Sequence, residues 1–127
     1  MTADNRIAEA GLFIRKVEIE LGDTVILELD LLLANTQNAI PFKEYVLDMI
    51  SHGQKKIIID LRNAYIIDST FIGAMVIILK KIKKSDGQLR LVLNSEIKSI
   101  RSFFITGLDK VFDIYNNLDE AKQSIIE

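Results

Sequence analysis

The first third of the chain alternates apolar and polar residues with a period of two, from residue 13 to residue 31. That period is the side-chain repeat of a β-strand, because successive side chains point to opposite faces. Gly22 and Asp23 divide the stretch and supply a tight turn, so the pattern predicts a β-hairpin. Its apolar positions are Phe13, Val17, Ile19 and Leu21 in the first strand and Val25, Leu27, Leu29 and Leu31 in the second.

Apolar residues then recur at helical spacing between residues 32 and 53. Pro41 suits the first turn of a helix, where its missing N–H removes no hydrogen bond, and Asn38 or a neighbour would cap that turn. Gly53 can end the helix in a left-handed conformation. The expected core face of this first helix is Phe42, Tyr45, Val46, Met49 and Ile50.

The segment KKIIIDL at 55–61 is short, β-branched and almost continuously apolar. A strand of this kind is covered on both faces or lies centrally in a sheet. A second helix is predicted over 71–84, because apolar residues again repeat at helical spacing, and Ser85-Asp86-Gly87 would end it. Its expected core face is Phe71, Met75, Ile78, Leu79 and Ile82.

The rest of the chain continues the alternation of strands and helices. It predicts a strand at 88–94, a helix from Asn94-Ser95 to Gly107, a short strand at 111–115 and a terminal helix at 118–126. The third helix would present Ile97, Ile100, Phe104 and Leu108 to the core.

The predicted order of elements is ββαβαβαβα. Strands that alternate with helices predict parallel pairs, so we expect an α/β fold with a mixed β-sheet, a β-hairpin start and helices packed against the sheet. Residues 12–127 would form a single domain, which suits the length of 127 residues. Residues 1–11 are polar without a strong period and are expected to be a flexible N-terminal arm.

Composition narrows the classes of function. Hydrophobic residues make up 49% of the chain, enough to build a core, and the formal net charge of −2 gives no electrostatic support for DNA binding. The chain has no cysteine and begins without a recognisable targeting signal, which favours a cytoplasmic protein. The longest apolar run, Phe71 to Leu79, is much shorter than the roughly 20 residues of a membrane-spanning helix, so no membrane insertion is expected.

Catalytic constellations are missing. His52 is the single histidine and falls near the end of the first predicted helix, where a cation is favoured for structural reasons. Without a second histidine or a cysteine there is no metal-ligand spacing, and no phosphate-binding or dinucleotide fingerprint occurs. The sequence therefore predicts a protein that is not an enzyme and needs no cofactor.

Three consecutive polar residues, Asp68, Ser69 and Thr70, interrupt an apolar stretch where a strand gives way to a helix. One interpretation is a helix cap, in which Asp68 or Ser69 accepts a hydrogen bond from a backbone N–H. The other is a modification site, because a phosphoryl group on a hydroxyl in the first turn lies beside backbone N–H groups and the positive end of the helix dipole. Spacing alone favours the cap.

The segment from 55 to 114 resembles the STAS family, and more narrowly the bacterial anti-sigma-factor antagonists. The family pattern is a hydrophobic strand that ends in Asp-Leu, a short loop, and then Asp-Ser-Ser/Thr-Gly-Leu-Gly at the start of a helix. Here Asp60-Leu61 ends the strand, and Asp68-Ser69-Thr70-Phe71-Ile72-Gly73 opens the helix. The resemblance covers about residues 12 to 126 and implies a STAS-like single domain.

That resemblance implies a function. In the family the second hydroxyl after the Asp is the phospho-acceptor, which corresponds to Thr70, with Ser69 as the alternative. The partner would be an anti-sigma factor with serine/threonine kinase activity, and a cognate phosphatase would remove the phosphate. The unphosphorylated antagonist, a monomer or weak dimer, would bind the anti-sigma factor and free the sigma factor. The implied partner-binding residues are Asp68, Ser69, Thr70, Phe71, Ile72, Gly73, Asn35 and Thr36.

Three further points remain open from the sequence. Phe71 stands where the family has Gly, so its ring is expected either to obstruct a kinase or to add an apolar contact to the docking surface. The family also includes scaffold subunits of stressosomes and regulatory subunits beside membrane transporters, and these give an alternative function. A lysine cluster at 80–84 indicates a solvated helix end, and an acidic partner for it stays an alternative.

Overall fold

The computed structural model describes residues 14–20, 23–29, 33–34, 36–64, 66–94 and 107–125. Its main sheet has five strands in the order β1-β2-β4-β6-β7, with β1 antiparallel to β2 and the other neighbours parallel. The mixed sheet and the hairpin start are therefore confirmed. The strands are β1 (Ile14–Glu20), β2 (Thr24–Leu29), β4 (Lys56–Asp60), β6 (Gln88–Val92) and β7 (Asp113–Tyr115).

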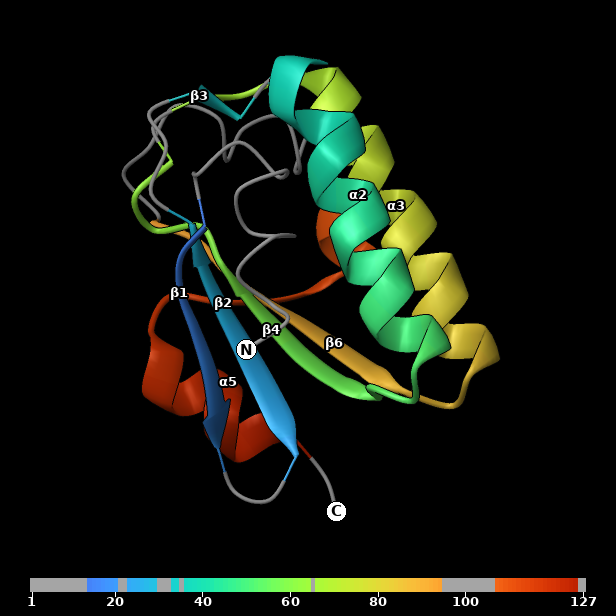
Figure 1. Cartoon of the computed structure of the whole chain (residues 1–127). Coiled ribbons are helices and arrows are strands. Elements are labelled where there is room, and N and C mark those ends of the chain that lie inside the picture. Colours follow the sequence, from blue (N-terminus) through green and yellow to red (C-terminus); the bar gives the residue numbers. More distant parts are fainter. Residues whose placement is uncertain are drawn as a thin grey trace.

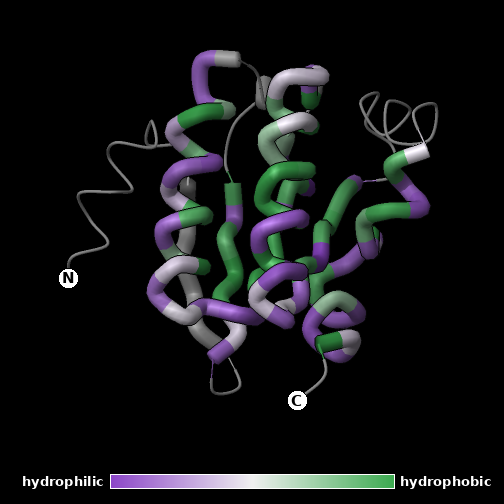
Figure 2. Tube along the Cα trace, turned by 90° about the vertical axis from the view of Figure 1, so that its right-hand side faces the viewer, coloured by the Kyte–Doolittle hydropathy of each residue, from purple (hydrophilic) through white to green (hydrophobic). Residues whose placement is uncertain are grey.

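Helices cover both faces of this sheet (Figure 1). The helices α2 (Thr36–Ser51) and α3 (Ser69–Lys84) lie side by side on one face, and α5 (Leu118–Ser124) lies on the other. A short 3-10 helix, η1 (Leu108–Lys110), precedes β7. In Figure 2 the strands are mostly hydrophobic, whereas the helices alternate between hydrophobic and hydrophilic residues. This contrast follows from burial, because the central strands are covered on both sides and each helix on one side only.

The central strand β4 confirms the expectation of a strand covered on both faces. Ile57 and Ile59 join the larger core cluster beneath α2 and α3, whereas Ile58 joins a smaller cluster with residues of α5. All three side chains are completely buried. Parallel pairing with β2 on one side and β6 on the other fixes their register.

The end of the first helix agrees with the prediction, but its start does not. Gly53 has φ 98°, and the bonds Gly53 N–H to Ile50 O and Gln54 N–H to Met49 O close a Schellman motif. The expectation that Pro41 lies in the first turn is wrong, since α2 begins at Thr36 and Pro41 is inside the helix. Pro41 removes one backbone donor from the helix, and the core contacts of the nearby Ala39, 1% exposed, and of Phe42, fully buried, hold this part of α2 against the sheet.

The sequence did not predict two very short strands. β3 (Leu33–Ala34) and β5 (Ile66–Ile67) pair in parallel, with Leu33 opposite Ile66 and Ala34 opposite Ile67. Two-residue strands are too short to show a period, which is why the pattern missed them. They precede α2 and α3 directly, so they bring the starts of these two helices together.

The remaining predicted elements divide into those confirmed and those outside the described residues. The second helix has the expected core face, with Phe71, Met75, Ile78, Leu79 and Ile82 all buried. The strands at 88–94 and 111–115 and the terminal helix correspond to β6, β7 and α5. The predicted third helix and the arm at 1–11 lie outside the described residues, except that Gly107 has φ 78° and Leu108 begins η1.

Gly87 provides a test of how tightly α3 joins β6. A methyl group on Gly87 would lie 2.6 Å from Ile82 Cγ1 and 2.6 Å from the backbone oxygen of Lys55. The backbone of Lys55 has no room to move, because its oxygen accepts a 2.7 Å hydrogen bond from Gln88 N–H. We therefore expect Gly87→Ala to lower the free energy of unfolding by about 1–3 kcal/mol, measured by urea denaturation.

Gly73→Ala is the matched control. A methyl group there would meet no atom within 4 Å, and the position is an exposed helix interior. This variant is expected to be about 0.5–1 kcal/mol more stable than the parent, since alanine is the better helix former. If Gly87→Ala were as stable as Gly73→Ala, the described approach of Lys55 to this turn would be wrong.

Candidate functional site

The candidate site is the start of α3, where Asp68 acts as the helix cap. Asp68 has extended backbone angles, φ −87° and ψ 172°. Its Oδ1 accepts a 2.9 Å hydrogen bond from Phe71 N–H, and its carbonyl oxygen accepts a 3.0 Å bond from Ile72 N–H. Of the two capping interpretations, Asp68 is therefore the correct one and Ser69 is not needed as a cap.

Ser69 and Thr70 occupy the first two helical positions, and both are exposed. Their hydroxyl-bearing side chains project from the turn that carries the positive end of the helix dipole. No acidic residue follows in this first turn. The arrangement places two accessible hydroxyls where a phosphoryl group would be electrostatically stabilised by the backbone.

The pairing of β3 with β5 determines what lies beside these hydroxyls. Ala34 is opposite Ile67, and two residues later the chains enter α2 at Thr36 and α3 at Ser69. The starts of α2 and α3 therefore lie at the same end of the molecule, where β3 is labelled in Figure 1. Asn35, the other predicted flanking residue, lies outside the described residues.

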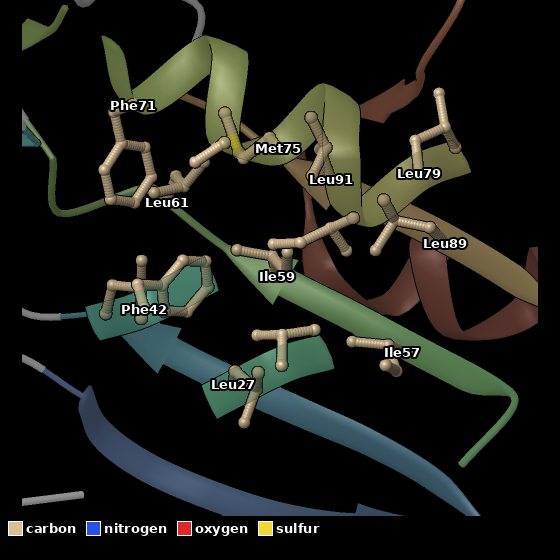
Figure 3. Close-up of a cluster of buried hydrophobic side chains, with 14 of the residues drawn as sticks. Leu27, Phe42, Ile57, Ile59, Leu61, Phe71, Met75, Leu79, Leu89 and Leu91 are labelled. Atoms are coloured by element: carbon tan, nitrogen blue, oxygen red, sulfur yellow. The ribbon is translucent and has the colours of Figure 1, made fainter. Parts of the chain in front are cut away.

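The Phe71 side chain lies in the core and not at the surface that was predicted to bind a partner. Its side chain is fully buried and stacks on Phe42, with ring centroids 5.4 Å apart and an interplanar angle of 17°. Figure 3 shows the ring pointing toward Phe42 and Leu61 in the core. The physical reason is helical geometry, because the third position of α3 faces the sheet and an aromatic ring there gains by burial. Neither the expected obstruction of a kinase nor the extra apolar contact follows.

The other predicted residues separate in the same way. Ile72 is 6% exposed and belongs to the core, so its side chain contributes little to any surface. Gly73 is exposed and lies one turn after Ser69. Of the predicted partner-binding residues at the start of α3, Asp68, Ser69 and Thr70 can therefore present their side chains to a partner, and Gly73 lies beside them.

An ion pair at the end of β4 was not predicted as part of the site. Asp60, 2% exposed, binds the Arg62 guanidinium at two points, Nε to Oδ1 at 2.9 Å and a terminal nitrogen to Oδ2 at 2.7 Å. Arg62 N–H also donates to Oδ1. These hydrogen bonds raise the pKa of Arg62, and the charges of Asp60, Glu28 and Asp119 raise it further while partial burial opposes them. The sequence signal for this ion pair was an aspartate at the end of an apolar strand with an arginine two positions later.

This ion pair fixes the loop that leads to the site. Leu61 N–H bonds to Val92 O at 2.8 Å, and Ala64 N–H bonds to Leu61 O at 3.0 Å. Leu61 and Ala64 are both fully buried on either side of the Arg62 turn. Residues 61–64, the described segment after β4, are therefore held by backbone hydrogen bonds and by the burial of Leu61 and Ala64.

Other candidate chemistry is absent from the described part of the chain. His52 is exposed and donates to the carbonyl oxygen of Asp48 at 2.8 Å, as expected for a histidine at a helix end. Within the described ranges no three metal-ligating side chains gather into a cluster. The helices in those ranges are also too short or too polar to cross a bilayer.

The comparisons with known proteins agree with this arrangement. The model of the STAS domain matches residues 17–121, which is most of the chain. The chain belongs to the STAS domain family. The sequence resemblance and the fold prediction are thereby confirmed, including the single-domain α/β architecture with parallel strands.

Two comparisons within the STAS family show how near the relatives are. A Thermotoga maritima protein with the provisional name anti-sigma factor antagonist is 37% identical over 92 residues, which cover 72% of this chain and 80% of the relative. The crystal structure of a Thermotoga maritima protein with the same provisional name superposes with a TM-score of 0.75 at 31% identity, covering 92% of this chain and 97% of that one.

A more distant neighbour shows the fold alone. The Bacillus protein SpoIIAA in its phosphorylated form has a TM-score of 0.63 at 18% identity, over 85% of this chain and 96% of that one. The same protein in its unphosphorylated form gives the same TM-score at 16% identity.

The cap can be tested by two neighbouring substitutions. Asp68→Ala removes the acceptor of Phe71 N–H and is expected to lower the free energy of unfolding by about 0.5–2 kcal/mol. Ser69→Ala, the matched control, is expected to change it by less than about 0.5 kcal/mol, because an exposed serine there is not the cap. Chemical denaturation measures both. Equal losses for the two variants would contradict the assignment of Asp68 as the cap.

The burial of Phe71 gives a second test of the site geometry. Phe71→Ala is expected to cost about 3–5 kcal/mol of stability, the usual loss for a buried aromatic ring. Ile77→Ala on the same helix, where the side chain is 46% exposed, is expected to cost about 1 kcal/mol or less. Thermal or urea unfolding distinguishes them. A loss for Phe71→Ala no larger than that for Ile77→Ala would place the ring outside the core.

Proposed function

We propose that this chain is an anti-sigma-factor antagonist that is switched by phosphorylation at the start of α3. In this proposal the unphosphorylated protein binds an anti-sigma factor with serine/threonine kinase activity. The kinase transfers a phosphoryl group to Thr70, with Ser69 as the alternative acceptor, and the modified protein is released. A cognate phosphatase then restores the binding form.

The observation that carries the proposal is the pair of exposed hydroxyls that follows the capping carboxylate of Asp68. Their sequence position matches the acceptor motif that the family resemblance implies. The provisional name of the Thermotoga maritima relative, at 37% identity, supports the same function class. The second hydroxyl, on Thr70, is the acceptor that this motif assigns.

Electrostatics explain why a phosphate at Thr70 would act as a switch. The modification adds about −1.5 to −2 charges, two residues from the Asp68 carboxylate. The α3 dipole and first-turn N–H groups would stabilise that charge within the free protein. A partner docked on the same turn would have to desolvate it without a compensating group, which costs several kcal/mol. Phosphorylation would therefore favour the free form.

The proposal also defines what the protein does not do. It is a binding protein and a kinase substrate, acts in the cytoplasm as a monomer or weak dimer, and does not bind DNA itself. Catalysis belongs to its partners, because the hydroxyls of Ser69 and Thr70 have no histidine base nearby: His52 lies beyond the far end of α2.

Thr70 substitutions test the switch. Thr70→Glu is expected to weaken binding to the anti-sigma factor at least about tenfold, a loss of about 1.4 kcal/mol or more in binding free energy. Thr70→Gln, the matched control, has the same size without the charge and is expected to bind more tightly than Thr70→Glu. Isothermal titration with the purified anti-sigma factor of the same source measures both.

Labelling with ATP tests the acceptor separately. Thr70→Ala is expected to abolish phosphate transfer from the kinase, while Ser69→Ala is expected to retain it. If Thr70→Ala were labelled as strongly as the parent protein, Ser69 would be the acceptor. If the parent protein neither bound nor was labelled, and instead formed a large particle on its own, the function would be that of a scaffold subunit.

A further inference from the structure

A continuous exposed ridge runs along α3 from the hydroxyls to the other end of the helix. Its members recur at steps of four, four, three and four residues, which places them on one side of an α-helix. All of them are exposed. The helix has 16 residues and so spans about 24 Å. The α3 ridge consists of Ser69, Gly73, Ile77, Lys80 and Lys84.

The middle of the α3 ridge consists of a glycine, which has no side chain, and an apolar isoleucine. Gly73 costs the helix about 1 kcal/mol relative to alanine, yet a methyl group there would meet no atom within 4 Å, so no contact inside the described molecule requires a glycine. Ile77 follows one turn later and is 46% exposed. Because Gly73 has no side chain, a partner can approach the helix backbone there. The same partner can bury the exposed Ile77 side chain one turn later.

The far end of the α3 ridge is strongly basic. Lys80 and Lys84 are four residues apart, so their charges repel each other by a few tenths of a kcal/mol. Neither forms an ion pair with another described residue, whereas Lys56, Arg62 and Arg90 each pair with an aspartate. The helix dipole favours cations in the last turn, but Lys80 lies a turn further back. The dipole therefore explains Lys84 better than Lys80.

We propose that the α3 ridge as a whole is the docking surface, and that its occupant is a protein segment with acidic residues opposite Lys80 and Lys84. This inference rests on the proposed function, because the same partner would cover the hydroxyls at the other end. The partner's acidic end would pair with the two lysines, and an apolar side chain would contact Ile77 beside Gly73. Charge complementarity at the lysines would mainly accelerate association.

A protein segment fits this surface better than a nucleic acid or a membrane. The chain has a net charge of −2, and exposed Asp86 lies two residues after Lys84, which would repel a long polyanion. The ridge has no aromatic side chain for stacking on bases. Ile77 alone offers too little apolar area to anchor the protein in lipid.

Binding kinetics with the anti-sigma factor test the inference. Lys80→Gln/Lys84→Gln is expected to reduce the association rate constant about three- to tenfold at low salt, with a smaller effect on dissociation and a weaker dependence on salt. Lys84→Gln alone is compared with Lys110→Gln, an exposed lysine on η1, which is expected to leave the rate constant unchanged. An unchanged rate constant for the double variant, while the parent protein binds normally, overturns the inference and leaves the proposed function standing.

A second experiment keeps the inference testable if no anti-sigma factor binds. The ¹⁵N-labelled chain is titrated with a short capped peptide of glutamates and leucines, and amide shifts are mapped by NMR. Shifts that centre on Ile77 to Lys84 and diminish at least about twofold in the double variant, but not in Lys110→Gln, support the ridge. Shifts spread over all lysine-bearing surfaces overturn it. Tighter binding to an oligonucleotide or to phosphatidylserine vesicles than to the peptide overturns it as well.

Discussion

The stacking of Phe71 on Phe42 is the contact on which the candidate site depends. The two rings join α2 to α3 above the sheet, and both are fully buried. Because an α-helix turns by about 100° per residue, burying Phe71 and Ile72 determines which neighbours face outward. Ser69 and Thr70 are the residues that this rotation leaves exposed. The burial of the Phe71 ring in the core therefore determines which side chains at the start of α3 face the solvent.

Two further constraints fix the position of this turn. The Asp60–Arg62 ion pair holds the chain as it leaves β4, and the short pairing of β3 with β5 aligns the starts of α2 and α3. Asp68 then begins the helix by accepting Phe71 N–H. These constraints act through the carboxylates of Asp60 and Asp68, the Arg62 guanidinium and backbone groups, whereas Ser69 and Thr70 are exposed at the surface.

The sequence predicted what depends on repeated spacing and missed what depends on tertiary contacts. The isoleucines of β4 and the core face of α3 follow from period and burial, and both are confirmed. Phe71 was predicted as a member of that core face from its spacing and as a partner-binding residue from the family motif, and the structure buries its ring against Phe42. Pro41 was placed in the first turn because residue propensity only weakly limits where a helix starts. The strands β3 and β5 were missed because two residues are too few to show a period.

In the proposed switch, one phosphate at the start of α3 separates this protein from its partner. The most direct measurement is the affinity of an anti-sigma factor for the chain before stoichiometric phosphorylation, after it, and after treatment with a phosphatase. Binding is expected to be lost on phosphorylation and recovered when the phosphate is removed, with no change in the fold. Equal affinity for the phosphorylated and unphosphorylated protein would rule out the proposed switch.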